Sequence, residues 1–263
     1  METALSQEIL ETYLPYGAVY PVVLAETDST NAQLKRLAAE GVPEGSAVFA
    51  RCQTSGRGRL GRSFASPPGG MYVSILWRPE ACDRLFCLTA LAAVAVRRAL
   101  STVCGVETQI KWRNDLLLGG KKLCGILTEL LSGSNGINAA VIGIGINVNT
   151  PVFAPELRGK ATSLLLETGR VTDENVLAAA LLRELGAARE ALRGNCEAYM
   201  TEYAAACVTV GRRVLVLRGD QTRPALAIGL DDCGALRVRY DDGTEETIST
   251  GEASIRNEDG DYV

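Results

Sequence analysis

The sequence contains no histidine, and this absence narrows the chemistry open to the protein. Without an imidazole there is no Ser-His-Asp or Cys-His nucleophile system and no histidine general base. Any reaction must therefore depend on charge stabilisation, on positioning, or on groups that are already ionised at neutral pH.

Metal-binding cysteine pairs are also missing. The eight cysteines are scattered without a Cys-x-x-Cys pair, whereas zinc sites need closely spaced thiolates, usually with an imidazole. The N-terminus lacks the regions of a signal peptide, and we find no apolar run of membrane-spanning length. We therefore expect a cytoplasmic protein with reduced cysteines, no structural metal and no membrane partner.

The charge shows no excess of basic residues that would suit nucleic acid. The 263 residues carry a net charge of −4, and residues 211–263 hold seven Lys/Arg against eleven Asp/Glu, with twenty of each before them. Hydrophobic residues make up 47% and charged residues 22%, as in ordinary globular proteins. We expect no nucleic-acid partner, and we interpret basic clusters as local pockets.

The residue pattern predicts two domains. Strand-like and helical segments alternate before residue 208, with strands expected at 20–27, 47–53, 71–77, 107–112, 122–131 and 139–148 and helices at 32–40, 83–102, 173–193 and 196–206. Short strand-like segments follow at 213–218, 224–230, 236–240 and 245–249. We predict a larger domain, residues 1–208, and a small β-barrel, residues 209–263.

Residues 52–62 alternate glycine with arginine. Arg57, Arg59 and Arg62 are interleaved with three glycines, and no acidic residue occurs from position 45 to 79. Glycine weakens helices and strands by about 0.5–1 kcal/mol relative to alanine, so the segment is predicted to be a loop. Guanidinium groups and bare backbone N–H groups suit an anion. A solvated basic loop is the alternative, but the flanking strands favour an ordered phosphate-binding loop.

Three further patches are polar, and two of them have a simpler structural explanation. They are Ser29-Thr30-Asn31, which could merely cap a helix, Lys111–Asp115 with residues 119–127, which could be a charged hairpin, and the Gly-x-Gly of residues 143–149. Two glycines in a strand allow close approach to the backbone, although the pattern alone is weak evidence.

In this order the patches resemble biotin protein ligases, which attach biotin to carrier domains of carboxylases. The recurrent family elements are Ser-Thr-Asn, Gly-Arg-Gly-Arg-x-Gly-Arg, Lys-Trp-Pro-Asn-Asp, Lys-Leu-x-Gly-Ile and Gly-x-Gly-x-Asn. Here they stand at residues 29–31, 56–62, 111–115, 122–126 and 143–147. The tail with residues 249–256 also resembles the small barrel of the family.

Two features depart from the resemblance. Arg113 stands where the family has proline, which fixes φ and lacks a donor, so arginine loosens the turn and adds charge. We expect altered nucleotide affinity rather than loss of function. About 20 residues precede the first predicted strand, too few for a helix-turn-helix domain, so we do not expect repressor activity.

The resemblance implies an α+β fold in which helices flank a mixed central sheet and an SH3-like barrel follows. It implies that biotin and Mg-ATP form biotinyl-adenylate, and that a lysine of a biotin carboxyl carrier protein then takes the biotinyl group. By this resemblance the catalytic residues are Lys122, Arg59, Lys111 and Asp115. Biotin would be bound by Ser29, Thr30, Asn31, Gln53, Arg57, Gly58, Arg59, Lys122 and Gly125. The nucleotide would be bound by Arg57, Arg59, Arg62, Trp112, Asn114 and Asn147, with Mg²⁺ arriving on ATP and Asp115 as a candidate ligand.

Two alternatives stay open at this point. A lipoate or octanoate ligase of the same fold would need a long apolar channel, whereas a ureido ring needs the polar partners that Ser29, Thr30 and Gln53 offer. A protein that binds biotinyl-adenylate without transferring it is kept open by Arg113. The sequence leaves the oligomeric state undetermined, with a homodimer among the alternatives.

Overall fold

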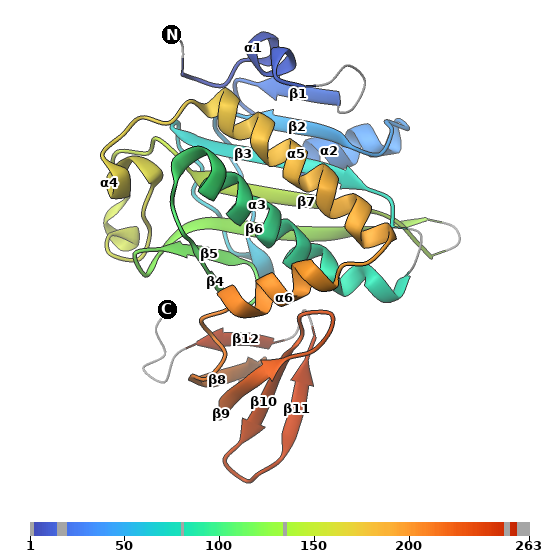
Figure 1. Ribbon diagram of the computed structural model, residues 1–263, viewed down its shortest axis with the longest axis vertical. Helices are drawn as coiled ribbons and strands as arrows, with labels where there is room; N and C mark the ends of the chain where they lie inside the picture. The colour runs from blue at the N-terminus through green and yellow to red at the C-terminus, as the bar shows by residue number, and fades with distance from the viewer. Residues whose placement is uncertain (1–2, 15–19, 80–81, 134–135, 250–252, 257–263) are drawn as a thin grey trace.

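The computed structural model describes residues 3–14, 20–79, 82–133, 136–249 and 253–256 (Figure 1). These residues form two sheets. The first has the strand order β1-β2-β3-β7-β6-β5-β4, and the second has the order β11-β10-β9-β8-β12. Only β1 and β2 run parallel, and all the other pairs are antiparallel. The first sheet is therefore mixed, as expected.

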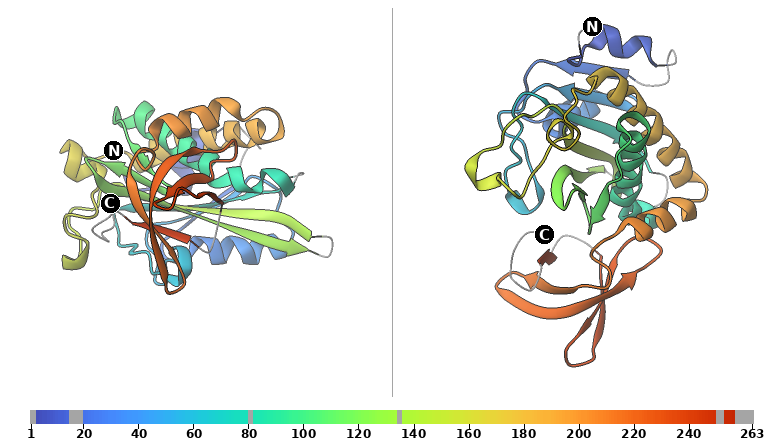
Figure 2. Two further views of the ribbon diagram at one scale, coloured as in Figure 1. Left: turned by 90° about the horizontal axis from the view of Figure 1, so that it is seen from below. Right: turned by 60° about the vertical axis from the view of Figure 1, so that its left-hand side comes forward.

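The larger sheet lies between helices, as Figure 2 shows. Its strands are β1 (Tyr20–Leu24), β2 (Ser46–Ala50), β3 (Gly70–Trp77), β4 (Gln109–Lys111), β5 (Asp115–Leu118), β6 (Lys121–Gly133) and β7 (Gly136–Asn147). The helices are α1 (Gln7–Thr12), α2 (Thr30–Ala39), α3 (Leu88–Cys104), α4 (Leu164–Thr168), α5 (Glu174–Arg193) and α6 (Glu197–Ala206). Helices α3 and α5 cover one face, and α2 covers the other.

Several of these elements were not expected from the sequence. The short strand β5 and the short helices α1 and α4 fall below the length at which periodicity is informative. The helix expected at 83–102 begins as a 3₁₀ segment (Cys82–Cys87), and α3 ends where Gly105 adopts the left-handed conformation with φ +66°.

Helix α3 is the central core helix. By length and composition the 20 residues Leu85–Cys104 could cross a membrane, so the expectation that no such run exists is wrong. In this fold 67% of the apolar window is buried, because α3 packs between the sheet and α5. Its apolar character is what a helix enclosed on several sides requires.

The helices begin at different kinds of residue. Asp173 caps α5, because its carboxylate accepts hydrogen bonds from the N–H groups of Asn175 (2.9 Å) and Val176 (3.3 Å). Ser29 occupies the same position before α2, but its side chain makes no capping bond. Simple capping therefore does not explain the polar residues that begin α2.

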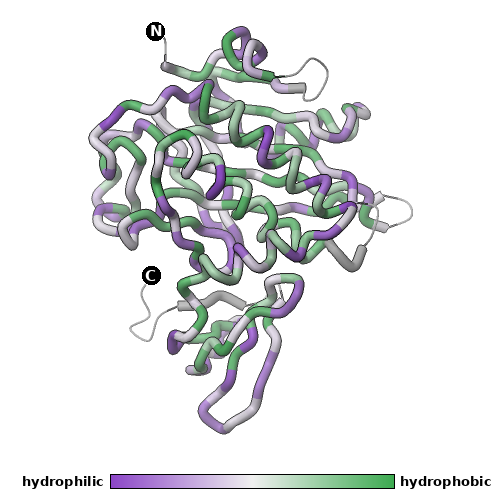
Figure 3. Tube along the Cα trace, viewed as in Figure 1, coloured by the Kyte–Doolittle hydropathy of each residue, from purple (hydrophilic) through white to green (hydrophobic). Residues whose placement is uncertain are grey.

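The second sheet comprises β8 (Arg213–Arg218), β9 (Gln221–Leu230), β10 (Leu236–Tyr240), β11 (Glu245–Ile248) and β12 (Ala253–Arg256). Leu236, Val238 and Tyr240 are buried while the arginines between them are exposed, the alternation of a one-sided sheet. Figure 3 shows the hydrophilic tip of the β10–β11 hairpin. Residues 250–252 and 257–263 lie outside the described residues.

Both sheets contribute side chains to one hydrophobic core. Val214, Ala225 and Leu236 of the second sheet belong to the same buried cluster as Leu91 of α3. The segment between the sheets also pairs with β4, because the N–H of Val208 donates to the carbonyl of Ile110 (2.9 Å). A domain boundary at residue 208 stays a prediction.

Leu91→Ala should lower the free energy of unfolding by about 2–5 kcal/mol, because Leu91 of α3 is fully buried in the common hydrophobic core. Leu130→Ala is the matched control, since Leu130 is 44% exposed and should change stability by less than about 0.5 kcal/mol. Urea unfolding measures both. Equal losses in the two variants would contradict the assignment of α3 as the core helix.

Candidate active site

One cavity of about 320 Å³ lies where the arginine loop, the start of α2, the β4–β5 turn, the first half of β6 and the second half of β7 meet. It brings together nearly all the residues that the sequence singled out. Those that line it are Ser29, Thr30, Asn31, Gln53, Arg57, Gly58, Arg59, Arg62, Lys111, Trp112, Asn114, Asp115, Lys122 and Gly125.

Asn147 is not among the residues that line the cavity. Its amide Nδ2 donates to the carbonyl of Thr162 (2.9 Å) and, weakly, to that of Lys122 (3.5 Å). Residues 160–162 also pair with the start of β6, because the N–H of Lys122 donates to the carbonyl of Lys160 (2.9 Å). Asn147 therefore links residues 160–162 to the start of β6 through its hydrogen bonds. Direct contact between Asn147 and a nucleotide stays a prediction.

One end of the cavity is polar and neutral. Gln53 Oε1 accepts hydrogen bonds from the N–H of Thr30 (2.9 Å) and from its hydroxyl (3.2 Å). The hydroxyl of Ser74 donates to Asn31 Oδ1 (2.5 Å), and Asn31 Nδ2 donates to Glu129 Oε2 (2.7 Å). These bonds fix Thr30, Asn31 and Gln53 before any ligand arrives. Ser74 and Glu129 were missed because each sits in an apolar strand without a motif.

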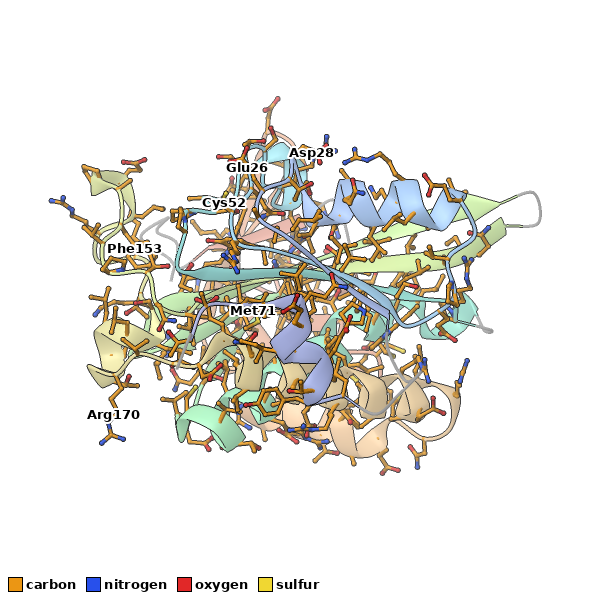
Figure 4. All side chains as sticks on the ribbon, turned by 90° about the horizontal axis from the view of Figure 1, so that it is seen from above. Glu26, Asp28, Cys52, Met71, Phe153 and Arg170 are labelled. Atoms are coloured by element: carbon orange, nitrogen blue, oxygen red, sulfur yellow. The ribbon has the colours of Figure 1, made fainter. Side chains whose placement is uncertain are left out.

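The loop before α2 is fixed from outside by Asp28. Its carboxylate accepts from the N–H of Ser29 (2.8 Å) and pairs with Arg36 (2.8 Å), and the Arg36 hydrogen bond holds the pKa of Asp28 well below its usual range. Figure 4 shows Asp28 on the same side of the sheet as Glu26 and Cys52, where the segments after β1 and β2 lie together.

The other end of the cavity is cationic. Lys122 Nζ lies 2.8 Å from Asp115 Oδ1, and Arg59 Nη1 donates to Asn114 Oδ1 (3.3 Å). Asn114 is itself fixed by donating to the carbonyl of Ile126 (2.9 Å). Among the described residues that line the cavity, Asp115 is the one carboxylate, set against several cations. The arrangement suits an anionic ligand.

The arginine loop is less free of acidic neighbours than its sequence suggests. Burial lowers the pKa of Arg59, and the charge of Asp115 acts in the opposite direction. Burial raises the pKa of Glu129, but hydrogen bonds from Lys35 and Asn31, with the charge of Arg57, lower it overall. The loop has no acidic residue near it in the sequence from position 45 to 79, but carboxylates distant in sequence come close to it in space.

The loop is ordered by its own backbone. The N–H of Gly58 donates to the carbonyl of Arg62 (2.7 Å), and Arg57 bridges Ser63. Between them Leu60 adopts a left-handed conformation (φ +55°) and is 59% exposed. A branched residue in this conformation is uncommon, and such strain is concentrated at functional sites.

The glycines of β6 and β7 accept side chains from elsewhere in the site. A Cβ at Gly143 would lie 2.2 Å from Asn31 Oδ1, and one at Gly145 would lie 2.5 Å from the ring of Phe64. The same ring comes within 3.0 Å of the position of a Cβ at Gly125. The Gly-x-Gly pattern thus makes room for two cavity-lining side chains. Phe64 was missed, although an aromatic directly after the arginine loop was a usable signal.

Three residues after β7 also line the cavity, although no sequence motif marked them as site residues. Leu157, Lys160 and Ala161 line the cavity. They come from an irregular segment that pairs with β6 through the Lys122–Ala161 bridge. Lys160 adds another cation to the site.

The fold and this cavity define a protein of the biotin/lipoate A/B protein ligase class, whose family description matches residues 23–147. Residues 209–256 match the biotin protein ligase C terminal domain. Together with the similarities described next, these matches show that the chain belongs to the biotin protein ligase family.

Relatives support this membership along most of the chain. The bifunctional ligase/repressor BirA of Bacillus subtilis is 33% identical over 250 residues, which cover 93% of this chain and 75% of BirA. The biotin–[acetyl-CoA-carboxylase] ligase of Mycobacterium tuberculosis is 37% identical over 223 residues, 81% of each chain. The structure of the biotin protein ligase from Aquifex aeolicus with biotin and ATP has a TM-score of 0.80 at 29% identity, covering 90% of this chain and 99% of that one.

Gly143→Ala should destabilise the protein by about 1–3 kcal/mol, because the added methyl group collides with the Asn31 amide, which Ser74 and Glu129 hold in place. Gly186→Ala is the control, since α5 has open space at that position and alanine should stabilise the helix by about 0.5–1 kcal/mol. Urea unfolding of both compares them. A Gly143→Ala protein as stable as the unaltered chain would show that Asn31 is not fixed.

Proposed function

We propose that this chain activates biotin with ATP and transfers the biotinyl group to a lysine of a biotin carboxyl carrier protein. The observation that carries the proposal is a cavity whose neutral polar end, at Thr30 and Gln53, adjoins a cationic end at Arg59, Lys111 and Lys122. The proposed substrates need both ends, because the ureido ring of biotin is neutral, whereas the carboxylate of biotin and the phosphates of ATP, which must meet, are anionic.

In the first step the biotin carboxylate attacks the α-phosphorus of ATP, a P–O bond forms, and pyrophosphate leaves. A carboxylate is already ionised at neutral pH, so the step needs no base, in keeping with a chain that has no histidine. The step is opposed by the electrostatic repulsion between the biotin carboxylate and the phosphates of ATP. Lys122, which Asp115 orients, and Arg59, which Asn114 orients, supply preorganised positive charge at that place.

The polar end would receive the ureido ring of biotin. Ser29, Thr30 and Gln53 offer donors and acceptors there, with Asn31 fixing the start of α2. Gly58 and Gly125 line the cavity, and the charge of Arg57 acts on Glu129. An apolar lipoyl chain would leave these polar groups unpaired, which disfavours lipoate.

The nucleotide would lie toward Trp112, Asn114 and Arg62. Mg²⁺ is proposed to arrive with ATP, because the described residues contain no group of three or more His, Cys, Asp or Glu that could hold a metal. Asp115, the candidate ligand, already pairs with Lys122 through Oδ1. The phosphates would therefore supply most of the metal ligands.

In the second step the amine of the carrier lysine attacks the acyl carbon of biotinyl-adenylate, an amide bond forms, and AMP leaves. The amine must lose a proton, and we propose Asp115 as the acceptor. The relative from Mycobacterium tuberculosis is described as a biotin–[acetyl-CoA-carboxylase] ligase, which supports a carboxylase carrier as partner. A cytoplasmic location and a homodimer remain parts of the proposal.

The unaltered chain should release pyrophosphate only when biotin, ATP and Mg²⁺ are all present. All residues proposed for this step lie in one chain, so no carrier is required. A coupled pyrophosphate assay measures the release, with lipoate in place of biotin as the control. Equal release with lipoate would refute the choice of substrate.

Lys122→Ala should slow adenylation by about 10²–10³-fold, because it removes a preorganised charge from the reacting centre. Lys121→Ala is the matched control on the adjacent residue. Lys121 pairs with Glu167 (3.2 Å) outside the cavity and its side chain is 43% exposed, so its rate should stay near that of the unaltered chain. Single-turnover adenylation compares the two, and equal rates would refute the role of Lys122.

A further inference from the structure

A continuous chain of hydrogen bonds runs from a partly exposed ion pair, Lys35 with Glu129, to the neutral end of the cavity. Lys35 Nζ lies 2.5 Å from Glu129 Oε1, and Asn31 Nδ2 donates to Glu129 Oε2 (2.7 Å). The Ser74 hydroxyl reaches both Asn31 Oδ1 (2.5 Å) and the hydroxyl oxygen of Thr30 (2.8 Å). Of these five described residues, Asn31 and Thr30 line the cavity and the other three do not. The chain therefore connects a distant charge to a group that can contact a ligand.

The first link of this chain has only one possible direction. Burial raises the pKa of Glu129, but hydrogen bonds from Lys35 and Asn31 lower it overall, so the group is a carboxylate at neutral pH and can only accept. Asn31 Nδ2 also donates weakly to the carbonyl of Leu127 (3.4 Å), a second acceptor. Because both acceptors face the amide nitrogen of Asn31, its Oδ1 must face Ser74.

The directions of the other bonds follow from counting protons. A hydroxyl has one proton and the amide oxygen of Asn31 has none, so the proton of Ser74 belongs to the bond with Asn31. The contact between Ser74 and Thr30 then requires the proton of Thr30. Thr30 Oγ1 also lies 3.2 Å from Gln53 Oε1, so this proton is shared in a three-centre bond. The Thr30 hydroxyl is left to offer a ligand a lone pair rather than a proton.

We propose that Glu129 is a positioning residue that, through Asn31 and Ser74, commits the hydroxyl of Thr30 to accept a hydrogen bond from the ligand. This inference rests on the proposed function, in which Thr30 meets the ureido ring of biotin. Each ureido nitrogen carries an N–H, which an accepting hydroxyl fits. A ring oxygen at the same place would set two acceptors against each other, and a buried acceptor without a donor is costly. Glu129 thereby acts on specificity without contacting the substrate.

The test compares biotin with its two carbamate analogues, in each of which a ring oxygen replaces one ureido N–H. Calorimetry on the intact chain measures the three dissociation constants. The analogue with its oxygen at Thr30 should bind about tenfold more weakly than biotin, the loss expected for an unpaired buried acceptor. We call this factor, the Kd of the weaker analogue divided by the Kd of biotin, the discrimination ratio.

Glu129→Gln keeps the size of the side chain but removes its charge, so the amide of Asn31 can turn and Ser74 can donate to Thr30. The Thr30 proton is then available to a ring oxygen, and the discrimination ratio should fall about tenfold, to near one. Ser74→Ala interrupts the chain at another residue and should lower the ratio in the same way. It takes the place of Glu129→Gln in the comparison if that variant does not fold. Glu40→Gln, at the exposed end of α2, is the matched control and should leave the ratio unchanged.

Three results would overturn the proposal alone. They are an unaltered chain that binds all three ligands equally, a ratio in Glu129→Gln equal to that of the unaltered chain, and equal losses of affinity for biotin and both analogues. The last would identify Glu129 as a structural contact, which weakens every ligand alike. In each case the unaltered chain still binds biotin. An unaltered chain that binds no biotin would instead overturn the proposed function together with this inference, so the two failures are distinguishable.

Discussion

The ion pair between Asp115 and Lys122 is the contact on which the rest of the site depends. Asp115 is 3% exposed, and its carboxylate lies between cations that would otherwise repel one another. Asp115 stands opposite Gly125 in the antiparallel pairing of β5 and β6, and the Lys122 side chain lies over Gly125, so both partners of the ion pair are held by strands rather than by a mobile loop. The cations that line the cavity outnumber its one carboxylate among the described residues, and their net positive charge favours anionic substrates.

The second sheet and the segment before it hold the β4–β5 turn, which lines the same cavity, through hydrogen bonds. Trp112 donates through its indole N–H to the carbonyl of Gly234 (2.8 Å) and through its backbone N–H to the hydroxyl of Thr209 (3.0 Å). With the contact from Arg113 to Ser249, residues after 208 hold the β4–β5 turn at several points. The small sheet therefore contributes to the geometry of the nucleotide end as well as to the common core.

Much of the architecture could be predicted because long elements carry strong periodicity. Strands β8 and β10 agree with the predicted segments to the residue, and α5 to within one residue. The motif residues also converge, apart from Asn147. What could not be predicted was the support around them. Ser74, Glu129 and Lys160 act through contacts between distant segments, and no local pattern marks a residue whose partner lies far away in the sequence.

The most direct test of this account is a crystal structure of the chain after incubation with biotin and Mg-ATP. We expect biotinyl-adenylate in the cavity, with its ring at Thr30 and Gln53 and its phosphate within hydrogen-bonding distance of Lys122 and Arg59. A ligand bound elsewhere, or a ring at the cationic end, would contradict the division of the cavity on which the proposed function rests.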